Sequence, residues 1–173
     1  MSSAMSDLAM PSPPSHADML RHLRQANRVA AEAREHGHHP FGAILVGPDG
    51  ETVLLSQGNV STVDHAESVL ARRAFADFDA QTLWGSTLYT TVEPCVMCAG
   101  TQYWAHIGTL VFALTERELL AMTGNHAENP TMDMPCREVF QRGQKPVRVI
   151  GPVPELAEEV SALHRDFWKS AEG

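Results

Sequence analysis

The sequence is poor in cysteine and in basic residues. Three cysteines in a chain of 173 residues are too few, and an odd number, for a disulfide framework, so a reducing compartment is expected. Lysine and arginine together number 13 against 21 aspartates and glutamates, which gives a net charge of -8. An acidic surface repels phosphate backbones and disfavours a nucleic-acid substrate, unless a local basic patch overrides it.

Long apolar runs are also missing, and none approaches the length that a bilayer-spanning helix needs. The first fifteen residues, MSSAMSDLAMPSPPS, lack the basic start and apolar stretch of a signal peptide. We expect residues 1–15 to form a disordered tail and residues 16–173 to form one domain. These absences predict a cytoplasmic protein without membrane contact.

Hydrophobic spacing predicts alternating helices and strands. Apolar positions over residues 19–33 recur at steps of three and four, as on one face of an amphipathic helix. The run at 41–46 and the turn that follows predict a hairpin with its second arm at 52–56. Further elements are expected as a helix from 66, strands at 87–92, 109–114 and 147–150, and helices at 95–105 and 156–167. This order predicts an α/β fold, a mixed sheet with helices on both faces; residues 115–146 show no clear pattern.

Two short motifs carry the strongest chemical signal. His65-Ala66-Glu67 and Cys95-Val96-Met97-Cys98 each begin a predicted helix, 30 positions apart (95 − 65). Two adjacent helix N-termini can aim one imidazole and two thiolates at a common point, and their partial positive charge favours the thiolate. Three such ligands leave a tetrahedral zinc one position for water, whose pKa the metal lowers to about 7.

Glu67 is the candidate proton carrier of this site. A carboxylate just beyond the histidine ligand can take a proton from the water and pass it to a leaving amine. A closed structural zinc site is an alternative, but such sites usually have four cysteine or histidine ligands. A redox Cys-x-x-Cys pair is another, and it leaves His65 and Glu67 unexplained. The repeated tripeptide at 126–128 lacks a second thiolate, so we interpret His126 as a loop residue.

The pattern H-x-E…P-C-x-x-C is the zinc deaminase signature, and the chain resembles the cytidine deaminase superfamily. The likeness runs from about Pro40 to Leu114, through FGAILV, HAE, LYTTVEPCVMCAG and YWA. It points to the branch of guanine deaminases, yeast-type cytosine deaminases and bacterial tRNA adenosine deaminases. The resemblance implies a three-layer α/β/α fold with a five-stranded mixed sheet, commonly dimeric. It implies zinc as cofactor, with His65, Cys95 and Cys98 as ligands and Glu67 as proton shuttle.

The same resemblance suggests where a substrate would bind. The family's substrate-binding asparagine maps to Asn59, although only five residues, 60–64, separate it from the first metal ligand. Backbone N–H groups near Ala66 are expected to meet a ring carbonyl. Trp104 lies where related guanine deaminases have their pocket or dimer interface; a buried helix face is the alternative. Glu116 follows a strand end, where some relatives use an acid on the substrate, with a solvated surface position as the alternative.

Trp168 is the last substrate-binding candidate. It interrupts the apolar stripe of the closing helix, which Phe167 continues, so we expect Phe167 in the core and Trp168 as a lid. Together these residues predict hydrolytic deamination of a small free base, guanine-like, cytosine-like or an aminotriazine, by a homodimer that binds no nucleic acid. A tRNA-specific adenosine deaminase and a catalytically silent zinc-binding scaffold remain as the alternatives.

Overall fold

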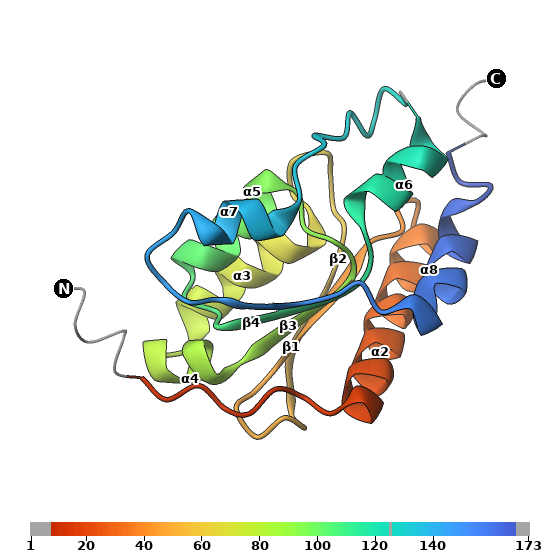
Figure 1. Ribbon diagram of the computed structural model, residues 1–173. Helices are drawn as coiled ribbons and strands as arrows, with labels where there is room; N and C mark the ends of the chain where they lie inside the picture. Colours follow the sequence, from red (N-terminus) through yellow and green to blue (C-terminus); the bar gives the residue numbers. More distant parts are fainter. Residues whose placement is uncertain (1–7, 125, 169–173) are drawn as a thin grey trace.

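The computed structural model describes residues 8–124 and 126–168 (Figure 1). Its strands are β1 (Gly42–Val46), β2 (Val53–Gly58), β3 (Thr87–Val92), β4 (Thr109–Leu114) and β5 (Arg148–Ile150). Its helices are α2 (His16–Glu35), α3 (Ala66–Asp77), α4 (Ala80–Gly85), α5 (Val96–Trp104), α6 (Glu116–Thr123), α7 (Cys136–Gln141) and α8 (Ala157–His164), with a 3-10 turn η1 (Pro154–Leu156).

The strands form one sheet in the order β2-β1-β3-β4-β5. β1 runs antiparallel to both β2 and β3, whereas β3, β4 and β5 are mutually parallel. The predicted five-stranded mixed sheet is therefore confirmed. Because β3 and β4 are parallel neighbours, their carboxyl ends open at the same edge, and the segments that follow them, 93–95 and 115–116, are brought together.

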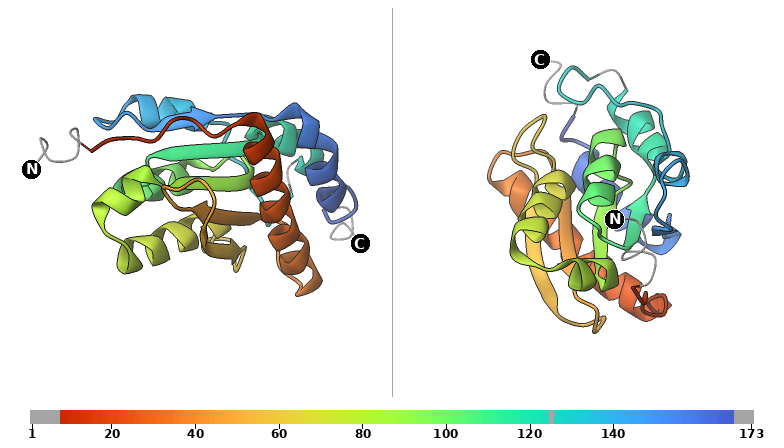
Figure 2. Two further views of the ribbon diagram at one scale, coloured as in Figure 1. Left: turned by 90° about the horizontal axis from the view of Figure 1, so that it is seen from below. Right: turned by 90° about the vertical axis from the view of Figure 1, so that its left-hand side faces the viewer.

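Residues along each central strand alternate between two hydrophobic cores, as the pleat of a strand requires. On β1, Ala43 and Leu45 belong to the core under α3, α5 and α7, while Ile44 and Val46 belong to the core under α2 and α8. Figure 1 shows these two helical layers on opposite sides of the sheet, and Figure 2 shows the same layers from two other directions. The expected three-layer arrangement is confirmed.

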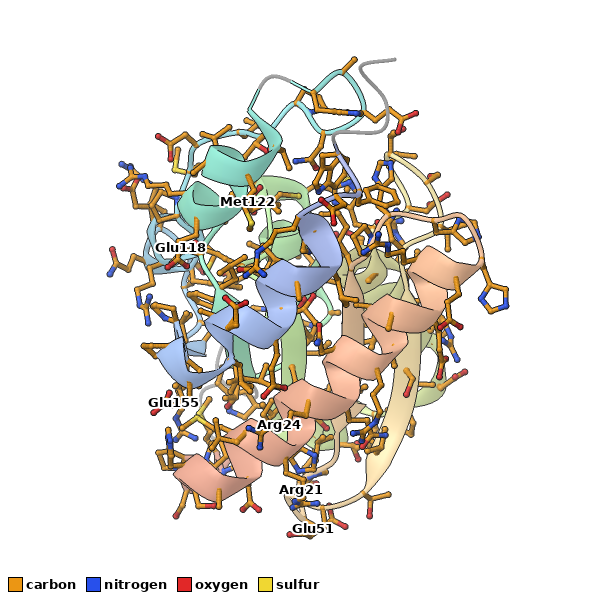
Figure 3. All side chains as sticks on the ribbon, turned by 90° about the vertical axis from the view of Figure 1, so that its right-hand side faces the viewer. Arg21, Arg24, Glu51, Glu118, Met122 and Glu155 are labelled. Atoms are coloured by element: carbon orange, nitrogen blue, oxygen red, sulfur yellow. The ribbon has the colours of Figure 1, made fainter. Side chains whose placement is uncertain are left out.

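Close packing of α2 on the sheet depends on a glycine. A Cβ atom at Gly42 would lie 2.4 Å from the Ala26 carbonyl oxygen and 2.5 Å from the Ala30 nitrogen. Those distances are far inside van der Waals contact, so only glycine lets α2 approach this closely. On its outer face α2 carries ion pairs, including Arg21 with Glu51 at 3.1 Å (Figure 3).

Three helices were not predicted, and the closing helix ends early. α4, α6 and α7 are short, and the last two lie in the segment that showed no periodicity. The expected closing helix over 156–167 is a 3-10 turn followed by α8, which ends at His164. Beyond that end the helical phase is lost, so Trp168 is buried and Phe167 only half-buried. The expectation that Phe167 is the core residue of the pair was wrong.

The expected tail divides at residue 8. Residues 1–7 lie outside the described residues, whereas residues 8–15 run extended along the body (Figure 2). There the Arg148 guanidinium donates a hydrogen bond of 2.9 Å to the Pro11 carbonyl. Among the described residues, no helix has the length and hydropathy to cross a membrane.

Candidate metal centre and the cavity beside it

Three predicted ligands meet at the N-termini of α3 and α5. His65 is the N-cap of α3 and Cys95 the N-cap of α5, and neither side chain caps its own helix. The His65 Nδ1 atom lies 3.6 Å from Cys95 Sγ and 3.5 Å from Cys98 Sγ. The two sulfurs are 3.6 Å apart. Both N-cap side chains are thus free to face a common point.

These separations fit a tetrahedral zinc site. Zn–S bonds of about 2.3 Å and Zn–N bonds of about 2.0–2.1 Å at tetrahedral angles place two sulfurs about 3.8 Å apart and a sulfur and nitrogen about 3.6 Å apart. His65, Cys95 and Cys98 form a compact group of possible metal-binding atoms. The donor set of one imidazole and two thiolates is also one that zinc prefers.

Neighbouring side chains orient the donor atoms. The His65 Nε2 atom lies 2.9 Å from the Thr62 carbonyl oxygen, so Nε2 carries the hydrogen and Nδ1 faces the sulfurs. The Ser68 hydroxyl donates to Cys98 Sγ at 3.2 Å. Such outer contacts fix ligand orientation before a metal binds.

The charges of the cluster also suit a cation. Hydrogen bonding from the Cys98 thiol, and from His65, lowers the pKa of Cys95 to about 4. The Cys95 sulfur in turn raises the pKa of His65 to about 9, while its proximity and burial raise the pKa of Cys98. Protons therefore stabilise the negative charge gathered here, and a metal ion would displace them.

Glu67 lies beside this cluster on the first turn of α3. Its side chain is 6% exposed, and the Thr90 hydroxyl donates to its Oε1 atom at 2.6 Å. Burial raises the pKa of Glu67. A carboxyl group with a raised pKa is suited to accept a proton and release it again near neutral pH.

A small cavity lies between these groups and a second wall, of which only Glu116 was predicted from the sequence. It occupies about 330 Å³ when the open solvent at its mouth is included. His65, Glu67 and Cys95 line one side. The remaining lining residues are Phe41, Val92, Glu93, Glu116, Leu119 and Asn129. A flat heterocycle would therefore contact the metal cluster and the start of α6 together.

Glu116 is brought into this cavity. It is 8% exposed, so the solvated alternative for this residue does not hold. Burial, followed by the charges of Cys95, Glu67 and Glu93, raises the pKa of Glu116 to about 8. The side chain is thus a neutral acid at pH 7, with one O–H donor and one carbonyl acceptor to offer.

The other substrate-binding candidates, Asn59, Ala66, Trp104 and Trp168, are not among the described residues that line the cavity. Ala66 is buried as the first residue of α3, where its N–H has no partner within the helix. Asn59 is buried, and its amide donates to the Ser61 carbonyl at 3.2 Å. Trp104 is 75% exposed and flanks a separate groove between α3 and α5. The cavity beside His65 does not bring Trp104 together with the metal cluster.

Trp168 is 3% exposed and packs behind the cavity wall. Its indole N–H donates to His164 Nδ1 at 3.1 Å. Ring centroids of His39 and His126 lie 4.9 Å and 5.1 Å from its own, and that of Phe41, which lines the cavity, lies 6.2 Å away. Trp168 therefore contacts the cavity only through other residues. His126 lies in a loop, as predicted.

Residues 17–114 match the family described as the cytidine and deoxycytidylate deaminase zinc-binding region. The chain belongs to this deaminase family. The deaminase is 33% identical over 156 residues to the probable cytosine deaminase of Schizosaccharomyces pombe, covering 86% of this chain and 91% of the relative. It is 38% identical to the guanine deaminase of Bacillus subtilis over 53% of this chain and 61% of the relative.

The chain is also similar to other deaminases. The tRNA-specific adenosine deaminase of Haemophilus influenzae is 35% identical over 54% of this chain and 57% of the relative. Among solved structures, the guanine deaminase from Nitrosomonas europaea has a TM-score of 0.65 at 21% identity, covering 96% of this chain and 91% of that chain. At a sequence identity of 21%, this similarity shows a shared fold and nothing more. The fold of this solved structure, the matched zinc-binding region and the three possible metal ligands thus all agree with the same family.

Five residues that line the cavity were not predicted from the sequence. Glu93 directly precedes Pro94-Cys95, and this placement could have marked it as a site residue. Phe41 and Val92 read as ordinary strand residues, and Leu119 as an ordinary helix residue. Asn129 lies in the segment 115–146 and carries no local pattern that connects it to the metal cluster.

Proposed function

We propose that this deaminase hydrolyses the C–N bond of an exocyclic amine on a small free base, releasing ammonia. Guanine-like purines, cytosine-like pyrimidines and aminotriazines are the substrate classes. The observation that carries the proposal is one small cavity lined by His65, Cys95, buried Glu67 and neutral Glu116. It holds metal donors, a proton carrier and a hydrogen-bonding wall within reach of one flat ring.

In this mechanism His65, Cys95 and Cys98 would hold zinc, which when bound would supply an activated water for attack on the amino-bearing ring carbon. Glu67 would accept one proton of that water and give it to the ring nitrogen; it would then carry the remaining hydroxyl proton to the amine, which leaves as ammonia when the C–N bond breaks and the C=O bond forms. The Thr90 hydroxyl occupies Oε1 of Glu67, so the second carboxyl oxygen is the one left to carry the proton. Thr90 thereby fixes the direction of transfer.

Groups on both walls of the cavity would contact the substrate. The unpartnered N–H of Ala66 at the start of α3 suits a ring carbonyl. Neutral Glu116 can donate to one ring atom and accept from its neighbour, as a base edge requires. Because one amide hydrogen of Asn59 is bonded to Ser61, a base contact by Asn59 uses its oxygen or its remaining hydrogen. Trp168 acts as a support behind Phe41.

A free base is a better substrate for this surface than tRNA. Three residues of the basic cluster Arg137, Arg142, Lys145 and Arg148 donate to the protein's own backbone: Arg137 to the Val149 and Gly151 carbonyls, Lys145 to the Tyr103 carbonyl and Arg148 to that of Pro11. RNA enzymes draw most of their affinity from phosphate contacts. Because the chain is 35% identical in sequence to a tRNA-specific adenosine deaminase, deamination of tRNA remains the alternative.

We also infer that the deaminase forms a homodimer through the groove between α3 and α5. Trp104 is 75% exposed and Phe75 58% exposed. Both flank this groove together with Ala71, Arg72, Thr101 and Ala105. Exposed apolar patches of this kind mark interaction surfaces. Light scattering of the purified protein tests the dimer, and a monomeric wild type at micromolar concentration contradicts it.

The function is tested by measuring ammonia release from guanine, cytosine, aminotriazines and nucleosides, with inosine formation in tRNA measured in parallel. We expect release from at least one free base, abolished in the matched variant Glu67→Gln, and no inosine. Inosine in the tRNA without ammonia from any base would replace this proposal with the editing activity. Zinc binding without any turnover would favour the silent scaffold.

A further inference from the structure

The two walls of the cavity are joined by one buried carboxylate, that of Glu93. Its Oε1 atom accepts a hydrogen bond of 3.0 Å from the Glu116 N–H, and its Oε2 atom accepts one of 2.8 Å from the Cys136 N–H. Glu93 is buried and lines the cavity itself. Both donors are first residues of helices, α6 and α7, and such N–H groups have no partner within the helix.

The backbone of Glu93 is fixed on the opposite side. Its N–H donates to the Leu114 carbonyl at 2.7 Å, which extends the pairing of β3 with β4. Only Pro94, with its restricted φ, separates it from Cys95. The side chain therefore connects the beginning of the cysteine motif directly to the start of the helix that carries Glu116.

We propose that Glu93 is the positioning residue that holds Glu116 against the substrate, at a set distance from the metal donors. The proposal rests on the proposed function in one respect, that Glu116 contacts the base. Glu93 has no part in proton transfer. Its two oxygens are occupied by backbone donors, and it acts on the substrate through Glu116 and the start of α7.

The test compares Glu93→Gln with Glu118→Gln in the zinc-loaded enzyme. A glutamine amide can accept one of the two backbone bonds but faces the other donor with its own NH₂. Losing one charge-assisted bond corresponds to roughly ten-fold or more. We expect KM to rise by about that factor in Glu93→Gln, with zinc content unchanged and kcat changed less. Glu118 is exposed on the same helix (Figure 3), and a glutamine there can also accept the capping hydrogen bonds from Thr115, so its variant should match wild type.

A double-mutant cycle separates positioning from a general structural effect. In the Glu116→Ala background, Glu93→Gln should add less than about two-fold to KM, because contacts that act through one residue are not additive. If the double variant raises KM by the product of the two single-variant factors, the proposal is wrong. Zinc loss in step with the rise in KM would also overturn it. If Glu93→Gln does not fold, Glu93→Asp, which keeps the charge but is too short for both donors, is measured with the same criteria.

Amide hydrogen exchange gives a measurement that needs no turnover. In Glu93→Gln the N–H of Glu116 or of Cys136 should exchange at least about ten-fold faster than in wild type, while Glu118→Gln leaves both unchanged. Unchanged exchange in Glu93→Gln would contradict the proposal even if a base is deaminated. Faster exchange in a protein that deaminates nothing would leave the positioning intact and remove the proposed function.

Discussion

The cavity has two walls of unlike origin. The first carries His65, Glu67 and Cys95 and is built from two helix N-termini that follow local sequence motifs. The second carries Glu116, Leu119 and Asn129 and comes from the segment 115–146. The family match ends at residue 114, where the first wall is complete. We therefore expect the metal chemistry to depend on the first wall and the choice of substrate to depend on the second.

The largest effect expected on the first wall comes from Cys98→Ala. Two remaining ligands hold zinc poorly, and metal binding is coupled to folding stability. Zinc content should fall to background, turnover should become undetectable, and the midpoint of urea unfolding should drop. Metal analysis after dialysis checks this, with Cys136→Ala as the matched control, since Cys136 is buried away from the cluster. Full zinc occupancy in Cys98→Ala would refute the ligand assignment.

On the second wall, Glu116→Ala should raise KM by about 10–100-fold while zinc and most of kcat remain, since a charged or strongly polar contact is lost. Glu116→Gln should stay within a few-fold of wild type at pH 7, because glutamine reproduces the donor and acceptor of a neutral acid.

The same pair of variants gives a pH test. The pKa of Glu116 is raised to about 8, so the donor is present below pH 8 and lost as the pH rises through that value. Wild-type KM should therefore increase above pH 8, whereas KM of Glu116→Gln should not. Parallel profiles for the two proteins would show that Glu116 does not donate to the substrate.

Removal of the residues after Leu163 tests the support behind the second wall. Without Trp168, Phe41 loses an aromatic neighbour at 6.2 Å, and we expect KM to rise by a few-fold or the substrate preference to change. Zinc should stay bound, because no ligand is touched. Steady-state kinetics with two bases measures this. If the truncated chain only unfolds, Trp168 is a core residue and its role at the site has no support.

The smallest effect concerns His164, which anchors Trp168. Burial lowers its pKa to about 4, below the ordinary histidine value of about 6.5, so the unfolded chain binds a proton that the folded one excludes between these pH values. This group alone should cost about 1.4 kcal/mol of unfolding free energy for each pH unit as pH falls from 6.5 to 4.

His164→Asn keeps an acceptor near Trp168 and should flatten that dependence. Urea unfolding between pH 7 and 5 is compared for wild type, His164→Asn and the exposed control His38→Asn. Equal slopes for wild type and His164→Asn would show that His164 is not buried as a neutral ring.

The first wall was predictable because its signals are local. Strand β4 has the bounds that its apolar run predicts, and His65 and Cys95 begin helices as expected. The start of α6 can also be predicted from a local pattern: Thr115-x-x-Glu118 is a capping box, and both of its hydrogen bonds form. Asn129 has no such pattern, because its place depends on contacts between segments far apart in the sequence.

The end of α8 shows a different limit. A stripe continued from Leu156 to Phe167 predicts one helix, but helical phase holds only while the helix lasts, and α8 ends at His164. The four residues that follow form turns, which buries Trp168. Its aromatic contacts with His39, Phe41 and His126 involve two segments far away in the sequence, and residue spacing within the helix does not predict them.

The most direct test of the account is Glu67→Gln, assayed for bound zinc and for ammonia release from the best free base. The account assigns Glu67 to proton transfer and not to metal binding. Zinc should stay at about one per chain while turnover falls by several orders of magnitude, beyond the roughly 10²–10⁴ of a single acid–base step, because one carboxyl serves several transfers. Near-normal turnover with zinc bound would contradict the central claim.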